Sequence, residues 1–123
     1  MKAHDLRATM SGPADWATPD GETRFWQPLR FNDGHLWVGR FGGRSPWERH
    51  PDSDELLHVL EGEVTLTVLA DDGPRDTLLR PGSVFVVPRG LWHRHTAQAL
   101  VTEYGVTMGR TESSEAEDPR AGV

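Results

Sequence analysis

Residues 47–62 read WERHPDSDELLHVLEG, and residues 82–93 read GSVFVVPRGLWH. The first stretch carries Glu48, His50 and Glu55 on the two sides of a turn-rich segment and ends in a glycine. The second stretch begins with a glycine and passes through a Pro-x-Gly turn to His93. Imidazole and carboxylate groups are the ligands that many divalent metals prefer in proteins. The two stretches therefore predict two halves of one metal-binding pocket.

The spacing in both stretches resembles the two motifs of the cupin family. The first cupin motif is a Gly, five residues, His-x-His, three or four residues, Glu, six residues and Gly, and here Glu55 and Gly62 keep its last gap. The second motif is a Gly, five residues, Pro-x-Gly, two residues, His, three residues and Asn, and it is matched by Gly82, Pro88, Gly90 and His93. Two positions differ from the family pattern, because Glu48 replaces the first His and Ala97 replaces the final Asn.

This resemblance implies an all-β fold, the double-stranded β-helix or jelly-roll barrel of small single-domain cupins, with little helix. It also implies a divalent metal ion, Fe(II), Mn, Ni or Zn, with the ligands Glu48, His50, Glu55 and His93. Glu48 has a second interpretation, as a carboxylate at the barrel rim paired with Arg44, Arg49 or Arg94. The remaining two His and one carboxylate would then resemble the facial triad of non-haem iron oxygenases. In both cases an octahedral metal would keep coordination positions free for water or substrate.

Other candidate residues follow from the alternation of side chains along a strand. His95 shares the face of His93, so it is either a hydrogen-bond partner or general acid/base of the site, or a packed imidazole. Tyr104 is either a proton donor that reaches the cavity or a core or interface tyrosine. The odd spacing of His58 from Glu55 turns it to the opposite face, where we expect a structural role. The same alternation turns the tryptophans that precede the proposed ligands, Trp47 and Trp92, away from the metal.

The composition excludes several other classes of function. A chain of 123 residues indicates one domain. Its net charge of −6 and pI near 5.4 argue against nucleic acid as a partner, because such binding depends on Lys and Arg. The absence of cysteine excludes disulfides and sulfur ligands for a metal. We find neither a signal-peptide pattern nor an apolar run that could span a bilayer, and we expect a cytoplasmic protein with no membrane partner.

Turn residues divide the chain into short strands, a pattern typical of an all-β sandwich or barrel. We predict a flexible N-terminal arm at 1–22, a barrel domain at 23–108 and a disordered acidic tail at 109–123. The expected strands are Arg24–Leu29, His35–Phe41, Glu55–Leu60, Glu63–Ala70, Asp76–Arg80, Ser83–Val87, Trp92–Ala97 and Leu100–Thr107. Alternation predicts that the core receives Val64, Leu66 and Val68. The turns after Leu60 and Pro81 predict a positive φ at Gly62 and Gly82.

These features favour a metal-dependent small-molecule enzyme, a dioxygenase, isomerase or lyase acting inside the barrel. One alternative is a non-catalytic cupin that binds or senses a sugar or carboxylate, and another is a cupin that has lost its metal, with Glu48 as the mark of that loss. The partner is in each case a small molecule. An apolar cluster near the start predicts a homodimer formed through an N-terminal strand; its members are Phe25, Trp26, Leu29 and Phe31.

Overall fold

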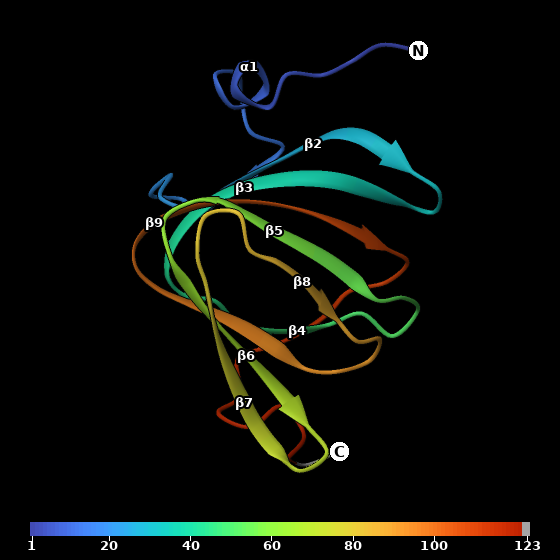
Figure 1. Ribbon diagram of the computed structural model, residues 1–123, viewed down its shortest axis with the longest axis vertical. Coiled ribbons are helices and arrows are strands. Elements are labelled where there is room, and N and C mark those ends of the chain that lie inside the picture. Colours follow the sequence, from blue (N-terminus) through green and yellow to red (C-terminus); the bar gives the residue numbers. More distant parts are fainter. Residues whose placement is uncertain (122–123) are drawn as a thin grey trace.

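The computed structural model describes residues 1–121, which form one short helix and a curled antiparallel sheet (Figure 1). The elements are α1 (Leu6–Met10), β1 (Trp16–Ala17), β2 (Arg24–Phe31), β3 (Gly34–Arg44), β4 (Trp47–Arg49), β5 (Glu55–Glu61), β6 (Val64–Ala70), β7 (Gly73–Leu79), β8 (Val84–Val87), β9 (His93–Met108) and β10 (Glu112–Ser114). The predicted all-β class is confirmed.

Strand β9 is the axis of the fold because it pairs with four other strands. Its first residues lie beside β6 and β4, and its last eight lie between β3 and β5. The sheet runs β1-β2-β3-β9-β4-β10, and β5 and β6 join it through β9, carrying β8 and β7 as their outer neighbours. Figure 1 shows β9 sweeping from the layer that contains β6 to the layer that contains β3 and β5. One long strand thus joins both sides of the barrel.

The sequence predicted two separate strands at 92–97 and 100–107, and this division is wrong. The structure has a single strand from His93 to Met108, with a register shift against β3 between Phe41 and Gly43. A register irregularity of this kind bends a strand while its ladder continues on both sides. Gln98 and Ala99, which the prediction left between two strands, therefore belong to one continuous strand.

The core lies inside the barrel, and the strand alternation places it there. In β6 the side chains of Val64, Leu66 and Val68 are buried, as predicted. They pack with residues from the other strands, including Leu57 and Val59 of β5, which have no exposed surface. Burying an aliphatic side chain of this size stabilises a fold by about 1.5–3 kcal/mol. This dry core surrounds the polar residues that the motifs bring inward.

A second apolar cluster lies outside the barrel, beneath α1. Met10 of the helix packs on Trp26 and Val38, and the indole nitrogen of Trp26 donates a hydrogen bond of 3.1 Å to the carbonyl of Gly12. Asp5 caps the N-terminus of the helix, and its side chain accepts a hydrogen bond from the backbone nitrogen of Ala8. It is five residues long, and within residues 1–121 no helix has the length and apolar character needed to cross a membrane.

The two terminal segments form elements of their own. Strand β1 pairs with β2, and β10 pairs with β4. Whether 1–22 is a mobile arm and 109–123 a mobile tail in solution stays a prediction. The predicted homodimer also stays a prediction: Trp26 from its proposed contact cluster is buried under α1, while Phe31 keeps 51% of its surface exposed. Sedimentation at about micromolar concentration tests the dimer, whose dissociation constant would lie at or below that range.

Gly62 provides a test of the turn between β5 and β6. Its φ of +79° confirms the prediction from sequence, and a Cβ there would also clash with the carbonyl oxygen of Leu100. Gly82 has a similar φ of +92°, but a Cβ there would meet no described atom within 4 Å. We expect Gly82→Ala to cost about 1–2 kcal/mol from the left-handed backbone alone. Gly62→Ala should cost at least about 1 kcal/mol more because of the clash.

Urea unfolding of both alanine variants and of the unchanged protein measures this difference. Equal destabilisation by the two substitutions would show that the clash of a Cβ at position 62 with the carbonyl oxygen of Leu100 costs no stability.

Candidate metal centre

Strands β4, β5 and β9 bring the residues of the two sequence motifs together. Glu48 of β4 and His93 of β9 are direct register partners. His50 follows the end of β4, and Glu55 begins β5. One ligand atom each from Glu48, His50 and His93 lies within 4.8 Å of the other two. The structure therefore places the four sequence-predicted metal ligands in one cluster, with Glu55 in contact with both histidines.

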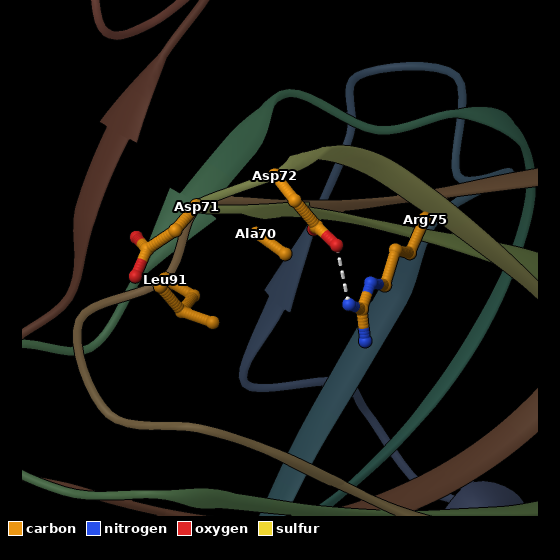
Figure 2. A pocket seen from close by; sticks show the side chains of 5 residues that line it. All are labelled: Ala70, Asp71, Asp72, Arg75 and Leu91. Carbon is orange, nitrogen blue, oxygen red and sulfur yellow. Dashed lines mark hydrogen bonds and ion pairs between the residues drawn. The ribbon is translucent and has the colours of Figure 1, made fainter.

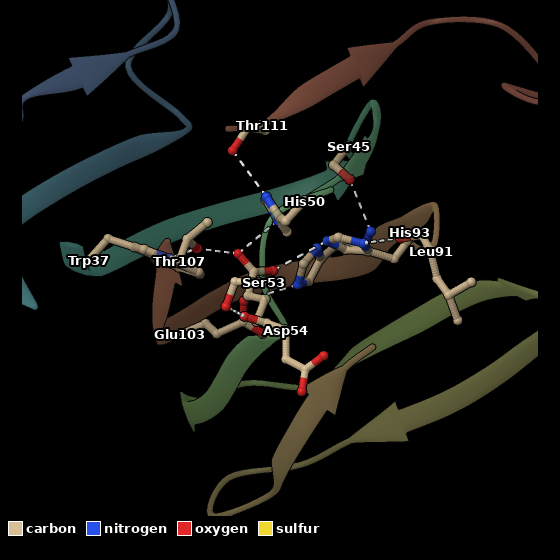
Figure 3. Close-up of polar contacts among 12 residues, drawn as sticks. Trp37, Ser45, His50, Ser53, Asp54, Leu91, His93, Glu103, Thr107 and Thr111 are labelled. Carbon is tan, nitrogen blue, oxygen red and sulfur yellow. Dashed lines mark hydrogen bonds and ion pairs between the residues drawn. The ribbon is translucent and has the colours of Figure 1, made fainter. Parts of the chain in front are cut away.

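Glu55 lies between the two imidazoles. One of its oxygens is 3.0 Å from Nε2 of His50, and the other is 3.2 Å from Nε2 of His93. Thr107 donates its hydroxyl hydrogen to Glu55 and accepts a hydrogen bond of 2.8 Å from the indole nitrogen of Trp37 (Figure 3). Glu55 and both histidines are almost fully buried. This carboxylate thus fixes the distance between two imidazoles that come from different strands.

The charges in this cluster shift the ordinary pKa values. Burial would raise the pKa of Glu55, but the close approach and the charges of His50 and His93 outweigh it and hold that pKa far below 4.5. Burial would lower the pKa of His50, but Glu55, together with the charge of Glu48, raises it above 6.5. Burial and the charge of Glu55 raise the pKa of Glu48. The pocket therefore favours a positive charge between its carboxylates.

The Nδ1 atoms of the two imidazoles, on the side away from Glu55, also have hydrogen-bond partners. Nδ1 of His93 lies 3.1 Å from the carbonyl oxygen of Leu91, and Nδ1 of His50 lies 3.0 Å from the hydroxyl oxygen of Thr111 (Figure 3). A carbonyl oxygen only accepts, so Nδ1 of His93 carries a hydrogen and the lone pair of the neutral ring is on Nε2. Metal-binding histidines commonly have this arrangement, with the outer nitrogen donating and the inner nitrogen free to coordinate.

The inner nitrogens themselves show that the residues fit a cation. Within residues 1–121, the buried Nε2 atoms of His50, His93 and His95 have no partner in hydrogen-bond geometry, although each lies 3.0–3.2 Å from a carboxylate oxygen. A neutral imidazole lone pair that faces a carboxylate at this distance is repelled by it. The arrangement requires a proton or a metal ion between the two groups. Its nitrogen and oxygen donors suit a divalent transition metal.

A second pair, His95 and Glu103, lies beside this cluster. Nε2 of His95 is 3.0 Å from a carboxylate oxygen of Glu103, which has no exposed surface. The ring centroids of His93 and His95 are 6.4 Å apart. Burial would lower the pKa of His95, but the charge of the nearby Glu103 carboxylate raises it. Sequence analysis placed His95 on the inner face but missed Glu103. The available signal was a charged residue at an inward position of a predicted strand.

The outer face of the ligand strands carries two cation–π pairs. Glu48 and His93 are register partners, and Trp47 and Arg49 flank the first in sequence while Trp92 and Arg94 flank the second. The guanidinium carbon of Arg94 lies 4.1 Å from the ring centre of Trp47. The guanidinium carbon of Arg49 lies 4.7 Å from the ring centre of Trp92. Both tryptophans are buried against Leu69, so they face away from the cluster as predicted. The two arginines are thus engaged on the outer face, away from Glu48.

Two other sequence candidates lie outside the cluster. Tyr104 packs beside Met10, Trp26 and Val38. The centroid of its ring is 4.9 Å from the ring centroid of His58. Side chains alternate along β9, so Tyr104 faces outward where its neighbour Glu103 faces inward. His58 faces outward, as the sequence predicted. The structure does not bring Tyr104 to the site, so Tyr104 is not placed to donate a proton there.

A surface hollow of about 420 Å³ lies at the β6–β7 hairpin (Figure 2). Asp72 and Arg75 form an ion pair of 2.7 Å across it, and Ala70, Asp71 and Leu91 complete its lining. Leu91 also accepts the hydrogen bond from His93, so the hollow is adjacent to the candidate metal centre. Its lining contains none of the clustered His and Glu residues. The hollow is therefore separate from the chemistry of the site.

The pKa shifts predict how the stability of the metal-free protein depends on pH. The lowered pKa of Glu55 stabilises the fold above about pH 4.5, and this contribution is lost as pH falls below that value. The raised pKa of His50 stabilises the fold fully below about pH 6.5, and this contribution is lost as pH rises through the folded value. We expect the pair to contribute most between these limits.

Unfolding midpoints in a chelator, from about pH 4 to about pH 9, test this dependence. Glu55→Gln removes one of the two titrating groups and also the charge that raises the pKa of His50, so its profile should be flatter than that of the unchanged chain. Superimposable profiles would contradict an ion pair between Glu55 and His50.

Comparisons with known proteins agree with this fold. Residues 37–100, about half of the chain, match the profile of the cupin domain. An uncharacterized protein, YdbB of Bacillus subtilis (strain 168), is 39% identical over 64 residues, which are 51% of this chain and 53% of that protein. The chain thus matches about half the length of this curated relative.

Solved structures show the same architecture at low identity. A cupin-2 domain protein from Shewanella frigidimarina superposes with a TM-score of 0.68 at 20% identity, over 86% of this chain and 94% of that one. Hydroquinone 1,2-dioxygenase PnpCD, solved with Cd²⁺ and 4-hydroxybenzonitrile, superposes with a TM-score of 0.59 at 20% identity, over 68% of this chain and 63% of that one. Together with the motif spacing and the profile match, these likenesses lead to one conclusion: the chain belongs to the cupin domain family.

Proposed function

We propose that the protein binds one divalent metal ion inside the barrel through Glu48, His50, Glu55 and His93, and acts there on a small molecule. The observation that carries this proposal is the convergence of Glu48, His50 and His93, whose ligand atoms lie within 4.8 Å of one another. His50 and His93 are buried, where unpaired polar nitrogens destabilise a fold unless a partner is supplied. Fe(II), Mn, Ni and Zn all suit this donor set.

The residues of the chain have separate tasks in this proposal. Glu55 and Glu48 balance the charge of the ion, and Leu91 and Thr111 keep the inner nitrogens of His93 and His50 free. The buried core around the cluster limits water and strengthens these electrostatic interactions. A bound divalent ion supplies Lewis-acid activation of a substrate or, as Fe(II), the capacity for O₂ chemistry.

His95 and Glu103 extend the proposed site beyond the ligands. The carboxylate of Glu103 favours a proton on Nε2 of His95, and its own burial leaves it few alternative partners. His95 is thus suited to hold a proton beside the ligand His93 and to exchange it with a bound molecule. We assign His95 this acid–base role, with Glu103 as the residue that orients it.

The similarity to hydroquinone 1,2-dioxygenase supports an oxygenase among the reaction types, although an isomerase or lyase uses the same donors. The rival function is binding of a small sugar or carboxylate without turnover. To separate them, the protein is loaded with Fe(II) without oxygen and then mixed with O₂ and a panel of small phenols, sugars and carboxylates. Substrate-dependent O₂ uptake supports the oxygenase. A ligand that raises the melting temperature and is recovered unchanged supports the rival.

Substitution of the clustered residues tests metal binding itself. We expect about one divalent ion per chain in the unchanged protein, the stoichiometry of a single site. His93→Ala should reduce this occupancy to near zero because it removes a ligand nitrogen. Glu48→Ala should do so only if Glu48 is a ligand. Elemental analysis after dialysis measures both.

His58→Ala is the matched control, because it removes an imidazole on the outer face, beside Tyr104. The control should keep full occupancy. Full occupancy in His93→Ala would instead show that the metal site lies elsewhere, and no metal in the unchanged protein would end the proposal.

A further inference from the structure

The C-terminal segment after β9 makes a series of contacts with β4, the strand that carries Glu48 and ends just before His50. Strand β4 has three residues, and all three pair with β10: Glu112 with Arg49, Ser113 with Glu48, and Ser114 with Trp47. Within residues 1–121, the register pairing of β4 with β9 is confined to Glu48 and His93. Most of the backbone pairing of β4 therefore comes from the C-terminal segment.

Side chains at both ends of the segment fix its position. Arg110 donates hydrogen bonds to the carboxylate of Asp52 from its backbone nitrogen at 2.8 Å and from its guanidinium at 3.0 and 3.1 Å. At the other end, the indole nitrogen of Trp47 donates to the carbonyl of Glu117 at 3.2 Å. These contacts place the chain in one register along β4, and they place Thr111 beside His50.

Arg49 and Glu112 add a cross-strand ion pair. Two guanidinium nitrogens of Arg49 lie 2.9 and 3.2 Å from the same Glu112 oxygen. The pair is partly exposed, so solvent screens it and it contributes little to stability. The ion pair instead fixes the position of Arg49, which also stacks on Trp92, the residue before His93. The C-terminal strand is thus connected through Arg49 to β4 and to the residue that precedes β9.

We propose that Thr111 is a positioning residue for the metal centre, and that the C-terminal segment 110–117 holds it there. This inference rests on the proposed metal-binding function and adds a residue that lies outside the two motifs. To coordinate a metal through Nε2, His50 needs a hydrogen on Nδ1 and an acceptor for that hydrogen. The hydroxyl oxygen of Thr111, 3.0 Å away, is that acceptor (Figure 3). Without it, the ring is free to rotate or to change its tautomer.

Thr111→Val tests this role because valine keeps the shape of threonine and removes the acceptor. Loss of such an outer partner weakens metal binding by about 10–100-fold. We expect a loss of about tenfold, the lower end, because Thr111 is exposed and water can accept in its place. Titration calorimetry of the full chain with Zn²⁺ or Co²⁺ measures the dissociation constant, and the visible spectrum of bound Co²⁺ reports a change in His50.

Two variants serve as controls. Thr111→Ser retains the hydroxyl and should bind with nearly the affinity of the unchanged chain. Ser113→Ala removes the exposed hydroxyl of the middle residue of β10, and it should leave the affinity unchanged. The melting temperature of each metal-free variant separates a positioning role from a loss of fold.

An unchanged dissociation constant and Co²⁺ spectrum in Thr111→Val, with metal bound by the unchanged chain, would overturn this inference and leave the proposed function standing. If Thr111→Ser and Ser113→Ala lost as much metal affinity as Thr111→Val, the inference would also be overturned. Failure of the unchanged chain to bind either metal would remove both proposals.

Discussion

The structure depends on a carboxylate placed between two imidazoles in a dry interior. Glu55 reaches His50 with one oxygen and His93 with the other, at 3.0 and 3.2 Å. An unpaired carboxylate in this position would destabilise the fold by several kcal/mol, whereas a neighbouring positive charge compensates for its lost hydration. The interior of the barrel therefore requires either protons on the histidines or a metal cation. The same physical requirement links the stability of the fold to the chemistry of the site.

Strand β9 makes this arrangement possible because it belongs to both sides of the barrel. Its first residues carry His93 and His95, and its last residues carry Glu103 and Thr107, all on inward positions. The bend near Phe41 and Gly43 brings these two halves close together in the interior. A polar group from the end of the strand thus meets one from its beginning. Such contacts depend on the curvature of the sheet.

The outer surface of the same strands has a complementary role. Trp47 and Trp92 lie next to Glu48 and His93 in sequence, and each is covered by an arginine from the opposite strand. Each such pair contributes about 0.5–2 kcal/mol, depending on how far it is desolvated. The two pairs flank Glu48 and His93, the register pair that joins β4 to β9 in the described part of the chain. Tight packing outside the barrel can therefore keep the ligand atoms inside at fixed distances.

The sequence by itself determined the fold class, the inward residues of β6 and the cluster of Glu48, His50, Glu55 and His93. The inward residues of β6 follow from a local rule, the period of a strand, whereas the fold class and the cluster follow from the turn pattern and from the resemblance of the two motifs to the cupin family. Only the tertiary structure decided the continuity of β9, the pairing of His95 with Glu103 and the contact of Thr111 with His50. Thr111 and His50 are 61 residues apart, and the bend of β9 brings Glu103 back toward His95. Local patterns carry no information on such contacts, because they arise only when distant strands pair and the sheet closes.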